Sequence, residues 1–314
     1  MTQLPTVFIH TNDSQLLGAV VAAYSFRKYS RNPTAFDVRL LRLEETPQLL
    51  SRQGQTYLRK GRPAIWHNED LQSFSPLRRM VPQVMGFRNH ALVTDPDVFS
   101  VGGDVYDLLS RDMGDAAVVC RTLPDGAGPH QRATSVMLLD CAKLTNWQWD
   151  AQIDQMFASE LDYKPWIQLE DQPLETIDEL PEVWNSYDTL TDDTCLLHMT
   201  ERSTQPWKTG LPVDYNMNSA RKARSLKTRL RRWGVLPSKL YLKNPDQHQI
   251  DRFFGLMKEC LEQGEMTEAF IAQEIARKNL RPDVIEQLER VGYERSANRQ
   301  LRSDALLRAV QAGV

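Results

Sequence analysis

The sequence contains no hydrophobic run long enough for a membrane span and no large excess of charge of either sign. The longest uncharged stretch near the N-terminus, residues 14–26, is too short to cross about 30 Å of hydrocarbon, and no basic residue precedes it. The net charge of −3 argues against a strongly basic nucleic-acid binder. We therefore expect a cytoplasmic protein with neither a signal peptide nor a membrane span, and with no nucleic-acid partner.

Paired cysteines, internal repeats and low-complexity tracts are also missing. The cysteines at positions 120, 141, 195 and 260 lie far apart without a CxxC pair, which is typical of reduced thiols rather than of disulfides or structural zinc. Hydrophobic residues make up 41% of the 314 residues and charged residues 25%, which are ordinary values for a folded chain. This length allows two domains of roughly 150 residues, or one large α/β domain with an appendage.

Strand patterns and helix patterns alternate in the first half of the chain. A 3.6-residue period predicts a helix that begins near Leu16, with Asp13 or Ser14 as its cap. The predicted strands are residues 6–10, 36–43, 91–94, 116–120 and 136–139, and a short helix is predicted over residues 77–85. This alternation predicts an α/β fold, Rossmann-like, with a mostly parallel central sheet flanked by helices. Ligands of such sheets bind beyond the carboxyl ends of the strands.

The charge distribution changes sharply in the second half. Residues 165–197 contain nine acidic residues and no lysine or arginine, whereas residues 216–233 contain seven basic residues and no acidic one. Past Pro245, apolar residues recur at helical spacing. We predict an α/β domain over residues 1–215 and a basic, helical C-terminal extension over residues 216–314.

The tripeptide Asp95-Pro96-Asp97 directly follows the apolar strand predicted at 91–94. Two carboxylates at a strand end can converge on one divalent cation, and Pro96 stiffens the bend between them. The same tripeptide is also good turn chemistry that needs no cation. Two enzyme classes place such aspartates after a strand: phosphatases of the haloacid dehalogenase type, whose first aspartate attacks phosphorus, and GT-A glycosyltransferases. The phosphatase motif continues with a small-residue turn and threonine, and Val98 follows here instead.

Further segments, in order along residues 6–210, resemble the family-8 glycosyltransferases, the glycogenin and lipopolysaccharide galactosyltransferase type. The matching positions are residues 7–13, 95–99, 105–108, 135–140, 170–172, 196–198 and 205–208, together with Arg78 and Trp147. The resemblance implies a GT-A fold, a nucleotide-sugar donor and retention of the anomeric configuration.

The resemblance also implies a metal site made of Asp95, Asp97 and His198. Two carboxylates and one imidazole suit Mn²⁺ better than Ca²⁺, and Mg²⁺ is the alternative ion. The ion would bridge the two donor phosphates and neutralise their charge as the diphosphate leaves. Taken alone, His198 has the plainer interpretation of an ordinary histidine at a strand end.

Three more residues are expected to bind the nucleotide sugar together with Asp95. Arg78 and Lys208 would contact its phosphates, and Asp13 would accept a hydrogen bond from the nucleobase. The plainer interpretations are a solvated helix face for Arg78, a surface lysine for Lys208 and a helix cap for Asp13.

The catalytic residues that the resemblance implies are Asp171 and Gln172. Asp171 would contact sugar hydroxyls, and the amide oxygen of Gln172 would stabilise positive charge that develops at the anomeric carbon. The plainer interpretation of both residues is a solvated acidic loop.

Three departures from the family pattern affect the sugar site. Residues 133–135 are Ala-Thr-Ser instead of Asn-x-Gly, Pro173 replaces an acidic residue, and Gln205 stands where lysine is usual. The predicted function is metal-dependent, retaining transfer of a hexose from a nucleotide sugar, with UDP expected, to a carbohydrate or lipid-linked acceptor. The departures support the alternative, a non-catalytic nucleotide-sugar or glycan-binding module on the same fold.

The basic stretch 216–233 carries Leu226, Leu230 and Trp233 at helical spacing among its cations. This pattern predicts an amphipathic helix suited to peripheral contact with an anionic membrane surface, at the inner face of a membrane. Docking of the same helix on the acidic residues 165–197 is the competing interpretation.

Overall fold

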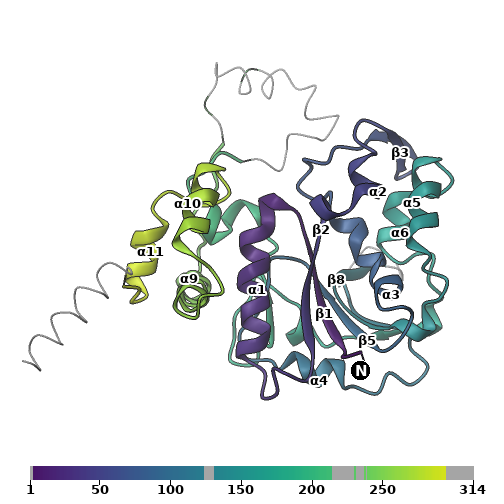
Figure 1. Ribbon diagram of the computed structural model, residues 1–314, viewed down its shortest axis with the longest axis horizontal. Coiled ribbons are helices and arrows are strands. Elements are labelled where there is room, and N and C mark those ends of the chain that lie inside the picture. The colour runs from purple at the N-terminus through teal and green to yellow at the C-terminus, as the bar shows by residue number, and fades with distance from the viewer. Residues whose placement is uncertain (1–2, 124–130, 214–229, 231–236, 238, 295–314) are drawn as a thin grey trace, which may run out of the picture.

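The computed structural model describes residues 3–123, 131–213, 230, 237 and 239–294 (Figure 1). Its centre is a six-stranded sheet in the order β2-β1-β5-β8-β7-β9. The strands are β1 (Thr6–Thr11), β2 (Asp37–Arg42), β5 (His90–Thr94), β7 (Val118–Thr122), β8 (Arg132–Asp140) and β9 (Ile177–Glu179). Within this sheet only β8 runs against the others. The predicted α/β fold with a mostly parallel central sheet is confirmed.

Alternating side chains of the buried strands supply two separate cores. Val7 and Ile9 of β1 point to one face of the sheet and Phe8 to the other, as the two-residue period of a strand requires. The first face packs against α1 (Leu16–Lys28) and α4 (Val105–Leu109), and the second against α3 (Val81–Val84).

A three-stranded sheet brings distant residues beside the end of β5. It consists of β10 (Ser186–Tyr187), β11 (Leu196–His198) and β6 (Val98–Ser100). β11 pairs antiparallel with β6, which places His198 opposite Val98. In addition, the N–H of Met199 donates to the carbonyl of Asp97 at 3.0 Å. The pairing therefore fixes where His198 lies relative to the two aspartates.

A separate aromatic core supports one wall of the site. The elements around it, at the upper right of Figure 1, are α2 (Pro47–Leu50), β3 (Thr56–Arg59), β4 (Arg62–Ile65), α5 (Trp149–Phe157) and α6 (Tyr163–Ile167). Trp66 lies 5.8 Å from the ring of Tyr57 and 5.7 Å from that of Phe157, both edge to face. Together with the ring of Tyr163 in α6, 5.8 Å from that of Tyr57, these contacts hold the β3–β4 hairpin, α5 and α6 together as one unit.

The C-terminal part is helical, as predicted, and packs on the outer side of α1 (Figure 1). Its helices are α9 (Gln247–Glu262), α10 (Glu268–Ala276) and α11 (Val284–Arg290). Phe253 of α9 stacks on Trp207 at 4.6 Å and meets Phe99 at 5.5 Å, so these helices share the core of the sheet. The domain boundary at residue 215 stays a prediction.

Two predictions about helices need comment. The single helix predicted over residues 77–85 is instead a 3-10 helix, Ser75–Arg79, followed by α3. Pro82 has no N–H to donate to the carbonyl of Arg78, so one continuous α-helix cannot form there. Of residues 216–233 the structure describes only Leu230, so the predicted amphipathic helix lies outside the described residues. None of the helices described has the length and apolar character that crossing a bilayer requires.

Candidate functional site

Asp95, Asp97 and His198 converge beyond the carboxyl end of β5. Each offers one ligand atom, and these atoms all lie within 4.8 Å of one another. Nε2 of His198 is 3.3 Å from Oδ1 of Asp97. The structure thus brings together the three residues for which the sequence predicted a metal-binding role.

Asp95 is held by two buried partners at one of its oxygens. Nε2 of His10 lies 2.7 Å from Asp95 Oδ1, and a terminal nitrogen of Arg78 donates to the same oxygen at 2.9 Å. Burial by itself would raise the pKa of Asp95, but Arg78 and then His10 lower it below the usual range. Asp95 is therefore ionised, and its Oδ2 has no hydrogen-bond partner among the described residues.

His198 is oriented by a buried amide. Its Nδ1 lies 3.0 Å from Oδ1 of Asn185, and Nδ2 of Asn185 donates to the hydroxyl of Ser135 at 3.2 Å. This arrangement makes Nδ1 the donor and turns Nε2 toward Asp97. Burial would lower the pKa of His198, but Asp97, with help from Asp95, raises it. The two carboxylates thus stabilise positive charge at this point, whether it is a proton or a metal ion.

The donor set fits a divalent cation. One carboxylate oxygen each from Asp95 and Asp97 and a ring nitrogen of His198 combine hard oxygen ligands with one borderline nitrogen, which suits Mn²⁺ and is compatible with Mg²⁺. The second oxygen of Asp97 accepts a hydrogen bond from Nε2 of Gln205 at 3.0 Å. Gln205, one of the departures from the family motif, therefore holds a predicted metal ligand in place.

A cavity of about 300 Å³ opens beside these residues. Its walls come from the end of β5, the start of β8, the β3–β4 hairpin and α6, and they are rich in basic side chains. The basic residues that line it are Arg59, Arg78, Arg132, Lys164 and Arg202. Such a cavity suits an anionic ligand, because positive charge raises the local concentration of anions.

Arg78 lines this cavity, but most of its donors serve the protein itself, and its predicted contact with phosphate stays a prediction. One terminal nitrogen donates to the hydroxyl of Thr134, and the other contacts His10 and Asp95. Arg78 therefore positions Asp95 and the start of β8, while its charge still faces the cavity.

The structure does not bring Asp13 into the cavity. A terminal nitrogen of Arg42 donates to Oδ1 of Asp13 at 2.6 Å, and the N–H of Asp13 donates to Glu44 at 2.8 Å. Asp13 thus joins the loops that follow β1 and β2, and its contact with a nucleobase stays a prediction.

Asp171 and Gln172 also lie outside the residues that line the cavity. Asp171 pairs with Arg79, whose guanidinium lies 3.7 Å from the ring centre of Trp147. Gln172 accepts from Nε1 of Trp147 at 3.0 Å and donates to Thr176 at 2.7 Å. Burial of Arg79 lowers its pKa to about 10, and the carboxylate of Asp171 offsets that cost. In this arrangement both predicted catalytic residues make structural contacts.

Lys208 is fully buried rather than placed on the cavity wall. It ends a 3-10 helix, Pro206–Lys208, and its Nζ lies 6.0 Å from the ring centre of Tyr241. The neighbouring Trp207 belongs to the core beneath α9. The predicted contact of Lys208 with phosphate is not part of this geometry.

Sequence reasoning missed His10 and Asn185, which orient two of the predicted ligands. His10 carried a signal in the sequence, because it is a polar residue in the apolar run 6–10. The structure shows that it is completely buried. Asn185 carried none, since its role depends on the pairing of β10 with β11.

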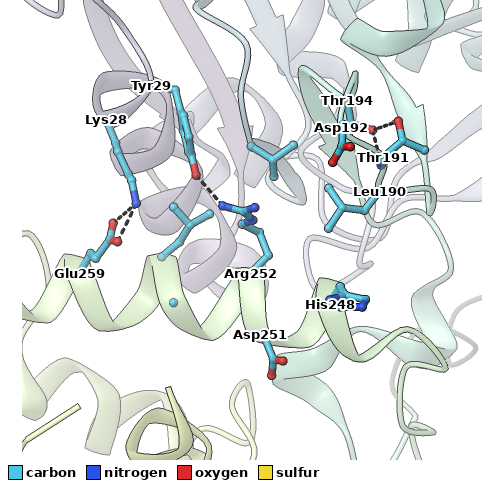
Figure 2. Close-up of a pocket in the computed structure, with 13 residues that line it drawn as sticks. Lys28, Tyr29, Leu190, Thr191, Asp192, Thr194, His248, Asp251, Arg252 and Glu259 are labelled. Carbon is cyan, nitrogen blue, oxygen red and sulfur yellow. Dashed lines mark hydrogen bonds and ion pairs between the residues drawn. The ribbon is translucent and has the colours of Figure 1, made fainter. Parts of the chain in front are cut away.

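A larger cavity, of about 620 Å³, lies between α1, α9 and residues 190–194. Three of its charged groups, Lys28, Glu259 and Arg252, make contacts between the two helices, as Figure 2 shows. Lys28 donates to Glu259 at 2.6 Å, and Arg252 donates to the hydroxyl of Tyr29 at 2.9 Å. Within the described parts of the chain, no metal-type cluster forms there.

Neither a known family model nor a curated protein matches this sequence. Among solved structures, it is similar to the glycosyltransferase GlyE of Streptococcus pneumoniae TIGR4, with a TM-score of 0.47 and 15% identity over 76% of this chain. The alignment covers 66% of GlyE. It is also similar to the galactosyltransferase LgtC in complex with donor and acceptor sugar analogs, with a TM-score of 0.43 and 14% identity over 78% of this chain and 99% of LgtC. For mouse xyloside xylosyltransferase 1 the TM-score is 0.39, with 10% identity over 64% of this chain and 98% of that protein.

Proposed function

We propose that this protein is a metal-dependent glycosyltransferase of the GT-A type that uses a nucleotide sugar as donor. The observation that carries the proposal is the convergence of Asp95, Asp97 and His198 at a strand end, beside a cavity lined by basic side chains. A nucleotide sugar leaves behind a diphosphate whose negative charge must be neutralised during transfer. A bound divalent cation supplies Lewis-acid chemistry for that leaving group.

The chain's own residues prepare the site for this chemistry. His10 and Arg78 hold Asp95 ionised and fixed in position, and Asn185 keeps Nε2 of His198 turned toward Asp97. Because these contacts fix the orientation of Asp95 and His198, little reorganisation of these two side chains is needed at the moment of reaction. Arg78 and Arg132 add positive charge to the cavity where the diphosphate would lie.

The finer features of the proposal rest on the resemblance of the sequence motifs. They are UDP as the nucleotide, a hexose as the transferred sugar, Mn²⁺ as the ion, retention at the anomeric carbon, and a carbohydrate or lipid-linked acceptor. Catalytic roles for Asp171 and Gln172 belong to this group, and they require both side chains to leave their present partners.

The second candidate is a non-catalytic module that binds a nucleotide sugar or a glycan. One observation favours it: the side chains of Asp171 and Gln172 are occupied by Arg79, Trp147 and Thr176. A site with a metal centre but no group near the sugar would bind without turnover.

Thermal unfolding with UDP, GDP or ADP, each with and without Mn²⁺, tests the class. A ligand at 100 times its Kd stabilises the native state by about 2.7 kcal/mol, so we expect a metal-dependent rise in Tm with one nucleotide. No metal-dependent rise with any of the three would overturn the proposal.

Hydrolysis of the matching nucleotide sugar without acceptor then separates the two candidates. The transferase releases free sugar slowly, and NMR shows whether its first-formed anomer keeps the donor configuration. Binding without hydrolysis, for several donor sugars, would favour the module.

A further inference from the structure

The site cavity is lined by three basic side chains that form no ion pair with a described carboxylate. They are Arg59 at the end of β3, Lys164 in α6 and Arg202 after β11. Arg59 lies 5.0 Å from the ring centre of Tyr163 and contacts the hydroxyl of Tyr57, but no ion pair is formed by these three residues within the described parts of the chain. We call these three residues the cationic wall.

The other basic residues of the cavity differ in this respect. Arg78 pairs with Asp95 at 2.9 Å, and Arg132 lies 3.4 Å from Glu179. The pKa of Lys164 is lowered by burial and by the positive charge of the cavity, whereas that of Arg59, which burial would lower, is raised by Tyr163, Tyr57 and Asp70. Burial, followed by the positive charges of Arg59, Lys60 and Arg78, lowers the pKa of Lys164, and only Glu170 opposes this. The wall therefore has a positive potential that a bound anion would relieve.

The donor proposed above does not account for all of this charge. The two aspartates balance a divalent cation, and Arg78 balances one of the two negative charges of a sugar diphosphate, because Arg132 is already paired with Glu179. One of the three cations Arg59, Lys164 and Arg202 balances the second charge, and the other two remain without a counter-charge. Holding unpaired cations around one cavity costs free energy, and a ligand of opposite charge offsets that cost.

We propose that the cationic wall binds an anionic group, a phosphate or a carboxylate, on the sugar that occupies this part of the cavity. The proposal rests on the proposed function for the meaning of the cavity. Arg59 and Arg202 present planar donor pairs that match the oxygens of phosphate or carboxylate, and Lys164 adds a compact point charge. The anionic group belongs either to the sugar of the donor or to the acceptor, and these two sources are separable.

Calorimetric titration measures both sources with defined probes. UDP-glucuronate is compared with UDP-glucose in the presence of Mn²⁺, and glucose 6-phosphate is compared with glucose on the protein saturated with UDP and Mn²⁺. We expect the charged member of one pair to bind at least about tenfold more tightly, the effect of one charge-assisted hydrogen bond. Equal binding of charged and neutral members in both pairs, or no binding of any of them, overturns the proposal.

Variants identify the groups responsible. Lys164→Met and Arg202→Met, which lie on different elements, should each remove about tenfold of the preference for the charged probe. Their affinity for UDP with Mn²⁺ should change less than threefold. The matched control is Lys243→Met, because Lys243 is exposed and does not line the cavity.

Two outcomes separate the inference from the proposed function. If the variants weaken UDP and the charged sugar equally, the wall serves the nucleotide and the inference is wrong, while the proposed function stands. If no nucleotide binds with Mn²⁺ to the wild-type protein, the proposed function fails. A preference for glucose 6-phosphate that persists without nucleotide, and that Lys164→Met removes, would then still support the cationic wall.

Discussion

The cavity between α1 and α9 and the cavity beside Asp95 differ in how their charges are used. The first is the larger, about 620 Å³ against about 300 Å³, yet Lys28 and Arg252 there are bound to Glu259 and Tyr29 (Figure 2). In the second, two carboxylates converge on one histidine. The comparison teaches that convergence of ionisable side chains on one point, rather than volume, distinguishes the candidate functional cavity in this molecule.

The two cavities also differ in the elements that form them. The larger one lies where α9 packs on α1, and its polar contacts help to attach α9 to α1. The smaller one lies beyond strand ends, where side chains from several segments meet without having to fill a core.

We expect the largest effect when an aspartate of the site is replaced, compared with the same replacement in the larger cavity. In Asp97→Asn the amide oxygen can still accept from Gln205, so the fold survives while a charged metal ligand is lost. Metal-dependent nucleotide binding should disappear, and turnover should fall on the order of 1000-fold, since the Lewis acid contributes several kcal/mol.

Asp192→Asn, in the larger cavity, is the matched control and should change neither quantity. Thermal shifts with Mn²⁺ and nucleotide measure the first effect, and release of sugar from the donor measures the second. Equal behaviour of the two variants would erase the distinction between the cavities.

An intermediate effect comes from two helix glycines, one behind each cavity. A Cβ on Gly18 of α1 would lie 2.5 Å from the carbonyl oxygen of Pro96, whereas a Cβ on Gly255 of α9 would meet nothing within 4 Å. Gly255→Ala should therefore stabilise the fold by about 0.5–1 kcal/mol. Gly18→Ala should destabilise it by about 1–3 kcal/mol and weaken Mn²⁺ binding, because α1 is pushed against the loop of Asp95 and Asp97.

Urea unfolding and Mn²⁺ titration of both glycine variants check this pair. A Gly18→Ala protein that is as stable as Gly255→Ala and binds Mn²⁺ like the wild type would show that close approach of α1 does not position the aspartates.

We expect the smallest effects when one lysine from each cavity is replaced, and the two replacements should change the stability of the fold in opposite directions. Lys28→Met removes a partly exposed ion pair with Glu259 and should lower stability by up to about 1 kcal/mol. Lys164→Met removes a cation whose pKa is lowered by burial and by neighbouring positive charges, so it should raise Tm at neutral pH.

The pH dependence of the second effect has a definite sign. The unfolded chain binds the Lys164 proton more tightly than the folded chain does, so the penalty is fully present below the folded pKa. The gain in Tm should shrink as the pH rises toward about 10.4, the ordinary lysine value. A gain that grows with pH would contradict uncompensated charge at this wall.

Much of the framework was predictable from local patterns. Apolar runs located β1 and β5, and the position of Asp95 and Asp97 directly after β5 placed them at the ligand-binding edge of the sheet. The adjacent arginines show where such reasoning stops. Arg78 faces the cavity, while Arg79 is buried against Trp147 and pairs with Asp171. Neighbours in sequence point to different partners because the 3-10 helix that carries them turns between the two positions.

By itself, the sequence determined the α/β alternation, the helical C-terminal part and the position of two carboxylates after a buried strand, because hydrophobic periodicity and turn chemistry act over a few neighbouring residues. Only the tertiary structure decided which polar side chains share a site. The pairing of β6 with β11 delivered His198 to the aspartates, and burial of Arg79 and Trp147 engaged Asp171 and Gln172 elsewhere. Buried charged and polar groups must find partners wherever the packed chain offers them, and no local pattern encodes that choice.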